Sequence, residues 1–116
     1  TFKIALFTDI SGYSTSSTAY STSNEVSSSG TNYSAGGNAL DSQAVSVASN
    51  TALVDFADEV FSSVTLSAVG AVIYNSTNSD KLVVVLDFGG TKTATNGDFT
   101  IQFPAAGAST AIIRIA

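Results

Sequence analysis

From residue 40 onward, apolar and polar side chains alternate in short segments separated by turn-forming residues, and this spacing gives the strongest restriction on the fold. Segment 43–57 predicts a hairpin in which Val45 and Val47 alternate with serines and Ser49-Asn50 forms the turn. The other alternating or apolar segments are 1–9, 63–75, 81–90, 98–103 and 111–116. No segment sustains the 3.6-residue period of an amphipathic helix.

Individual residues within these segments predict finer features. Gly70 lies in the middle of an apolar strand pattern and predicts a bulge or a bend between two sheets. The uninterrupted apolar run within 81–90 predicts a strand that is covered on both faces. Asn96-Gly97 predicts a two-residue hairpin turn. The residues expected to face inward in the following segment are Phe99, Ile101 and Phe103.

These segments predict the fold class. They amount to about 7–8 short strands with turns at a spacing of about 8–12 residues, which is typical of an antiparallel β-sandwich or a small barrel. A chain of 116 residues falls in the usual size range of one domain. We therefore expect an all-β, single-domain protein over residues 1–116.

A long polar tract, residues 11–38, interrupts the strand pattern after the first segment. Its isolated apolar residues are Tyr13, Tyr20, Val26 and Tyr33. A structureless loop of this length is uncommon inside a compact domain. We therefore expect either a short strand or helix near residues 19–26, or an N-terminal arm that is held by something outside the domain.

Charge excludes some classes of partner. Charged residues make up 11% of the chain, against about 25% in typical domains. The net charge is −5, and the basic residues are too dispersed to form a basic stripe. Binding to nucleic acid is not expected, because phosphate contacts supply most of that affinity, and an anionic membrane is disfavoured for the same reason. The sequence predicts neither a membrane span nor a signal peptide.

The side chains that usually carry catalysis are scarce. The chain contains no histidine and no cysteine, so its serines lack the usual general base. We expect no enzymatic activity, no catalytic residue and no cofactor. The best acidic cluster is Asp55, Asp58 and Glu59, which is either a solvated strand edge with its turn or a calcium site. The usual calcium-loop pattern is missing, so we predict no metal site.

The segment YSAGGNAL, residues 33–40, combines an aromatic residue, two glycines and a leucine at the end of the polar tract. It has two interpretations. The first is a loop whose glycines adopt positive φ while Tyr33 and Leu40 pack on the edge of the sandwich. The second is a close backbone approach to a neighbouring subunit. The candidate interface residues are Tyr20, Tyr33, Gly36 and Gly37.

Three stretches are informative together: TSNEVSSSGTNYSAGGNAL, VDFADEVFSSVTLSAVGAVIYN and KLVVVLDFGGTKTATNGDFTIQFP. They resemble a family of small virion structural proteins of tailed bacteriophages. The matching positions are Glu25-Val26, Gly30, Tyr33 to Gly37, Leu40, Phe56 to Asp58, Ala71 to Tyr74, Leu86 to Gly89 and Asn96 to Ile101. Residues 20–116 carry the resemblance. One departure is Phe61, which stands where a tryptophan is often expected.

The resemblance implies a non-enzymatic structural protein that is made in the host cytoplasm and located on the phage particle. The first expectation is a head decoration, or cement, protein that binds across neighbouring capsid subunits. Its partners would be the major capsid protein and copies of itself, as a homo-oligomer. The alternative is a tail- or fibre-associated component that binds a receptor or a tail protein. A non-viral carbohydrate-binding module is disfavoured because the chain has no tryptophan.

Overall fold

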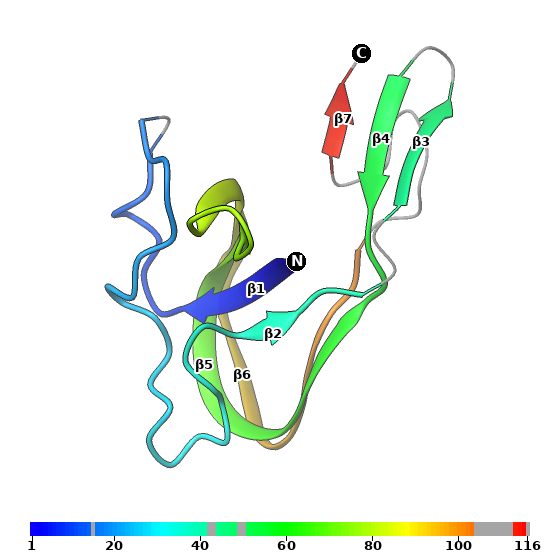
Figure 1. Ribbon diagram of the computed structural model, residues 1–116. Helices are drawn as coiled ribbons and strands as arrows, with labels where there is room; N and C mark the ends of the chain where they lie inside the picture. Colours follow the sequence, from blue (N-terminus) through cyan, green and yellow to red (C-terminus); the bar gives the residue numbers. More distant parts are fainter. Residues whose placement is uncertain (15, 42–43, 49–50, 104–112, 116) are drawn as a thin grey trace. The chain divides into compact units, whose positions relative to one another are not determined.

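The computed structural model describes residues 1–14, 16–41, 44–48, 51–103 and 113–115 of the chain. The described residues form strands and loops without a helix, which confirms the all-β prediction. They make two antiparallel sheets, and in this part of the chain neither sheet closes into a barrel. The strands, drawn in Figure 1, are β1 (Phe2–Phe7), β2 (Asn38–Ala39), β3 (Ala44–Ala48), β4 (Thr51–Asp55), β5 (Glu59–Asn75), β6 (Lys81–Ile101) and β7 (Ile113–Ile115).

The chain divides into two compact units, each built from two separate stretches of sequence. The first unit combines Thr1–Ala39 with Phe61–Phe99, and the second combines Leu40–Val60 with Thr100–Ala116. The expectation of a single domain stays a prediction.

Strand β1 is central in the first unit, whose sheet has the order β2-β1-β5-β6. It pairs with β5 in antiparallel register from Phe2↔Asn75 to Phe7↔Gly70. Residues 4–7 are fully buried. Because successive side chains of a strand point to opposite faces, both faces of β1 must be covered. The strand predicted at the start of the chain is therefore confirmed, and it forms the core of this unit.

One face of this sheet carries a cluster of fully or almost fully buried side chains. The cluster consists of Ala5, Phe7, Val72 and Tyr74. Partly buried residues packed against it are Ile10, Tyr13, Tyr20, Leu82 and Val85. Three of these, Ile10, Tyr13 and Tyr20, lie next to or within the polar tract, so the tract covers this face of its own sheet.

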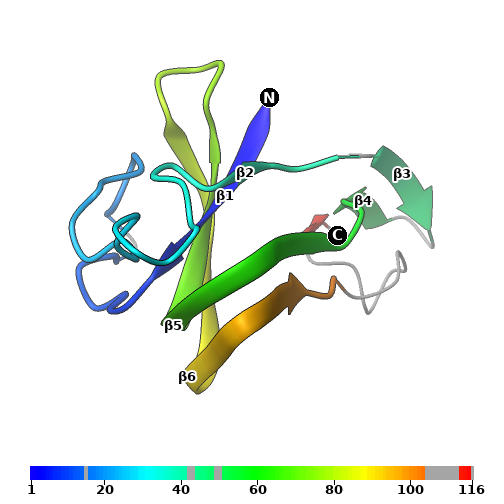
Figure 2. The same ribbon diagram turned by 90° about the horizontal axis from the view of Figure 1, so that it is seen from below.

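The expectation that the apolar run after Lys81 is covered on both faces is wrong. Strand β6 is the last strand in the sheet order, and residues 82–86 are half-buried or exposed. Val83 keeps 37% of its surface accessible. The apolar run belongs to an edge strand that is only partly covered, with Leu82 and Val85 packed against the core cluster. The turn that joins β5 to β6 is yellow-green in Figure 2.

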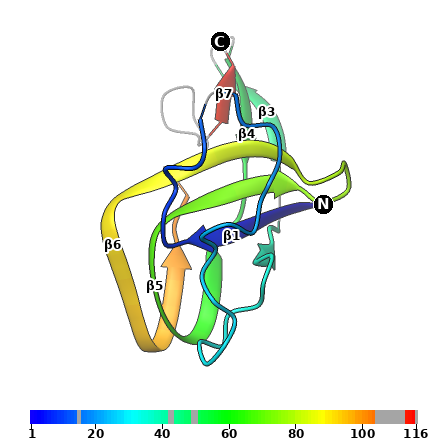
Figure 3. The same cartoon turned by 90° about the vertical axis from the view of Figure 1, so that its left-hand side faces the viewer.

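The hairpin predicted at Asn96-Gly97 is also wrong, because β6 continues through these residues as one strand. A type I′ turn requires positive φ at both central residues. Asn96 has a φ of 47°, but Gly97 has no positive φ. The Asn96 N–H instead donates to Thr65 Oγ1 on β5, at 2.9 Å. Strand β6 changes direction in Figure 3, and it contains three residues with positive φ, which are Gly89, Gly90 and Asn96.

Gly70 does not form a bulge, because the one-to-one register of β1 and β5 extends to it opposite Phe7, while the alternative of a bend stays a prediction. A Cβ added there would lie 2.5 Å from the Leu86 carbonyl oxygen and 2.8 Å from Ile10 Cγ2. The glycine therefore serves close packing, the other reason for a glycine inside a strand.

The second unit contains a three-stranded sheet of order β3-β4-β7. Strands β3 and β4 pair from Ala44↔Asp55 to Ala48↔Thr51, which confirms the two strands of the predicted hairpin. The predicted turn at Ser49-Asn50 lies outside the described residues. The predicted closing strand is present as β7, which pairs with β4.

Phe99, Ile101 and Phe103 are each 7% exposed, as expected for inward-facing residues.

Candidate functional site

The polar tract is attached to its own domain by backbone hydrogen bonds at two places. Beside β1, the Thr8 N–H donates to the Asn24 carbonyl at 2.9 Å, and the Val26 N–H donates to the Leu6 carbonyl at 2.9 Å. These bonds flank an isolated antiparallel bridge between Phe7 and Glu25. Figure 1 shows the tract as the blue-to-cyan loop beside β1 and β5.

The second attachment lies at the start of the edge strand β6. The Tyr20 N–H donates to the Asp80 carbonyl at 2.9 Å, and the Leu82 N–H donates to the Thr18 carbonyl at 3.0 Å. Ala19 forms an isolated bridge here. Of the two expectations for the tract, a short strand near residues 19–26 is represented only by isolated bridges. The tract is held within the chain.

The Glu25 carboxylate is the centre of a hydrogen-bond network inside the tract. Its Oε2 accepts a bond from the Tyr33 hydroxyl at 2.6 Å and one from the Gly36 N–H at 2.7 Å. Its Oε1 accepts a bond from the Tyr20 hydroxyl. The Tyr33 hydroxyl also accepts a bond from the Leu6 N–H at 3.0 Å. Hydrogen bonds to a carboxylate are stronger than neutral ones, so this network ties three parts of the tract to β1.

Aromatic rings extend the network across the sheet. The Tyr20 and Tyr74 rings are stacked, with centroids 4.2 Å apart and planes 9° apart. The Phe7 ring meets the Tyr13 ring edge-on at 5.5 Å and the Tyr20 ring at 6.2 Å. Such offset and edge-to-face pairs stabilise beyond the area that they bury. The Tyr74 hydroxyl donates to the Gly36 carbonyl at 2.6 Å.

Burial and neighbouring carboxylates raise the pKa of the phenols in this network. Desolvation is the main cause for both Tyr20 and Tyr33, and the hydrogen bond to Glu25 raises the pKa of each further. Burial, followed by the negative charges of Asp80 and Glu25, raises the pKa of Tyr74 to about 12. The three phenols therefore stay protonated and act as hydrogen-bond donors over the whole neutral range.

The two glycines of YSAGGNAL form the bend that the first interpretation requires. Gly36 and Gly37 have φ angles of 91° and 78°. A Cβ on Gly37 would lie 1.8 Å from the Ile4 carbonyl oxygen of β1, so no other residue fits there. Tyr33 and Leu40 are buried, at 3% and 6% exposed. The close backbone approach in this structure is thus to the chain's own β1, while the interface role of these residues stays a prediction.

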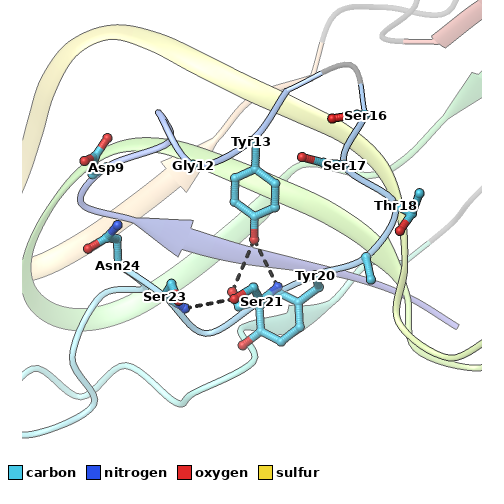
Figure 4. Close-up of a pocket in the computed structure, with 11 residues that line it drawn as sticks. Asp9, Gly12, Tyr13, Ser16, Ser17, Thr18, Tyr20, Ser21, Ser23 and Asn24 are labelled. Carbon is cyan, nitrogen blue, oxygen red and sulfur yellow. Dashed lines mark hydrogen bonds between the residues drawn. The ribbon is translucent and has the colours of Figure 1, made fainter.

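A groove opens on the surface of the tract, with a volume of about 520 Å³ (Figure 4). Its lining residues are Asp9, Gly12, Tyr13, Ser16, Ser17, Thr18, Ala19, Tyr20, Ser21, Ser23 and Asn24. Asp9 is the only charged residue among them. Bonds from the Ser11 N–H and side chain hold the pKa of its carboxyl below the usual value. Sequence reasoning missed this groove, and the only signal for it is a pair of tyrosines spaced within a serine-rich stretch.

The acidic cluster is separated by the fold. Asp55 ends β4 and Glu59 begins β5, so the three acidic residues do not share one strand. The Asp58 carboxylate accepts a bond from the Phe103 N–H at 2.8 Å. Asp55 Oδ1 is buried without a hydrogen-bond partner among the described residues. In that part of the chain, no group of three or more His, Cys, Asp or Glu side chains could hold a metal ion.

Comparisons of the chain with protein-family models, with curated proteins and with solved structures find no match. Within the described residues there is also no helix with the length and apolarity that crossing a bilayer requires.

Proposed function

We propose that the protein is a non-enzymatic structural protein of a bacteriophage virion. It decorates the head by binding across neighbouring capsid subunits, so its partners are the major capsid protein and further copies of itself. The proposal rests on the resemblance of residues 20–116 to small phage virion proteins and on one surface feature. We also propose that the two sheets form the predicted sandwich, since antiparallel sheets commonly pack face to face.

The surface feature is a pair of exposed valines on β3. Val45 and Val47 are 80% and 74% exposed, and they point to the same side of the strand because they are two residues apart. Strand β3 is an edge strand of its sheet. Adjacent exposed apolar side chains on an edge strand favour association with another protein surface. This observation supports a protein that works by docking.

The double substitution Val45→Ser/Val47→Ser tests this proposal. We expect purified wild-type protein to co-sediment with expanded empty phage heads, and the double variant to lose most of that binding. Each valine that becomes fully buried on docking contributes about 1.5–3 kcal/mol to binding, and the substitution removes this contribution. The matched control is Val83→Ser, which changes an exposed valine of the first unit. Equal binding by the double variant and the wild type would contradict docking through β3.

A tail- or fibre-associated role is the second candidate. The partly exposed Tyr13 and Tyr20 rings in the groove favour it, because aromatic side chains are common in recognition surfaces. Immunogold labelling of intact particles distinguishes the two roles. Labelling over the head supports decoration, and labelling confined to the tail supports the second candidate.

A further inference from the structure

The groove in the polar tract is lined mainly by side chains that carry hydroxyl groups. Hydroxyl groups come from Ser16, Ser17, Thr18, Ser21, Ser23, Tyr13 and Tyr20. Its volume of about 520 Å³ lies within the range of small-molecule sites, roughly 300–1,000 Å³. Tyrosine with serine and asparagine is also the composition of many antibody recognition loops, where rings give rigid contact area and hydroxyls give adaptable hydrogen bonding.

The frame of the groove is fixed by bonds within the protein. The Tyr13 hydroxyl donates to the Ser21 carbonyl at 3.2 Å and accepts from the Ser21 N–H at 3.1 Å. It thereby holds the two sides of the loop together, as Figure 4 shows. Tyr20 is stacked on Tyr74, and its hydroxyl is bound to Glu25. A site whose walls are held in this way loses little conformational entropy when it binds a ligand.

Other polar groups of the groove are available to a ligand. The side chains of Thr18, Ser23 and Asn24 are exposed, and none of them hydrogen-bonds to another residue that the structure describes. Together with the Asp9 carboxylate they present both donors and acceptors. The Asp9 carboxylate accepts a bond from the Ser11 N–H through Oδ1 at 2.8 Å, which fixes its orientation.

From these features we propose that the groove binds a neutral oligosaccharide. Sugar hydroxyls both donate and accept hydrogen bonds, and they match a lining of hydroxyl, amide and carboxylate groups. Tyr13 and Tyr20 line the groove and are only half-buried, so they offer apolar contact to the C–H faces of a sugar ring. Anionic ligands are disfavoured because the lining contains a carboxylate and no basic residue, and the chain carries a net charge of −5.

An array of immobilised oligosaccharides tests the proposal with the full chain. The array should hold neutral glycans of hexoses and N-acetylhexosamines beside their sialylated and sulfated counterparts. We expect binding to one or more neutral glycans and weaker binding to the anionic forms. Absence of binding across the neutral set, or a preference for the anionic forms, would overturn the proposal.

A double variant then tests whether the groove carries the binding. Thr18→Val removes a hydroxyl at constant shape, and Asn24→Gly removes an amide while allowing the positive φ of 65° at this position. We expect the variant to bind the selected glycan about tenfold more weakly, as for the loss of two ordinary hydrogen bonds. The matched control is Ser28→Ala, an exposed residue of the same tract that lies outside the groove. Unchanged affinity of the double variant overturns the assignment.

A measurement on the unaltered protein keeps the test independent of variant folding. Addition of the selected glycan should shift amide resonances of residues 9–24 in a heteronuclear NMR spectrum. Shifts confined to the rest of the chain would place the ligand elsewhere and overturn the proposal.

Discussion

Two kinds of residue, one carboxylate and one pair of glycines, determine how the polar tract meets β1. The Glu25 carboxylate accepts bonds from Tyr20, Tyr33 and Gly36. A partly buried carboxylate is tolerated because these donors replace water. Gly37 allows the chain to pass the backbone of β1 at a distance that excludes any Cβ.

The substitution Gly37→Ala should destabilise the protein by more than about 2 kcal/mol. A left-handed conformation costs a residue with a Cβ roughly 1–2 kcal/mol, and the clash with the Ile4 carbonyl adds to this cost. Urea denaturation followed by circular dichroism measures the change. The control is Gly12→Ala, where an added Cβ meets nothing within 4 Å. If both variants lose the same stability, Gly37 does not have the predicted role.

The raised pKa of Tyr74 predicts a loss of stability in alkaline solution. Its phenol has an ordinary pKa of 10.0 and a folded-state pKa of about 12. The unfolded chain therefore loses this proton at lower pH than the folded chain. The resulting stability is fully present below about pH 10 and is lost as the pH rises through about 12. The free energy of unfolding should fall over this window, and less steeply in Tyr74→Phe. Identical slopes in the two proteins would argue against the prediction.

At the scale of elements, the polar tract acts as a cover for one face of a four-stranded sheet. Tyr13 and Tyr20 pack on the cluster around Phe7, and the backbone of the tract forms hydrogen bonds to β1 and to the start of β6. Few of its residues are buried, so its attachment depends on a small number of specific bonds. The Glu25 network is the densest group of them.

The substitution Glu25→Gln should loosen the tract while the strands stay folded. A neutral amide gives weaker hydrogen bonds than a carboxylate, and its NH₂ group cannot accept the bond that one carboxylate oxygen accepted. Loss of hydrogen bonds to a charged group costs about 1.5–3 kcal/mol each. Hydrogen exchange read by mass spectrometry should be faster over residues 16–38 in the variant than in the wild type. Exchange over β1 and β5 should stay as it is in the wild type. Asp87→Asn, at an exposed carboxylate that accepts one bond from Gly89 N–H, is the matched control. Equal exchange in both variants would show that Glu25 does not hold the tract.

The strands that the sequence predicted well are those with local signals. The alternation in β1, in the β3–β4 hairpin and around Phe99 is a property of neighbouring residues, and it is present in the structure. The position of β6 at a sheet edge depends on strand order, which no local pattern encodes. The turn signal at Asn96-Gly97 failed because the same dipeptide also suits a bend within a strand, with positive φ at Asn96 alone.

The candidate site was harder to predict than the strands. The bend at Gly36-Gly37 and the packing of Tyr33 and Leu40 followed from residue type, and the structure has them. The role of Glu25 could not be foreseen, because its partners are spread along a serine-rich stretch where no periodic pattern indicates which side chains meet. The groove escaped prediction for the same reason.

For the whole molecule, each of the two compact units is assembled from two stretches of chain that are distant in sequence. Neither unit can be completed before the second half of the chain is available, because β5 and β6 supply most of the residues that close the first. The low charge and the exposed valines of β3 fit a protein that acts through association. We therefore propose that the whole molecule decorates the phage head.

Cryo-electron microscopy of expanded empty heads incubated with the purified protein tests whether it decorates the head. We expect additional density at symmetric positions, lying across neighbouring capsid subunits and absent from heads incubated without the protein. Heads without additional density, together with density on the tail of complete particles, would contradict it.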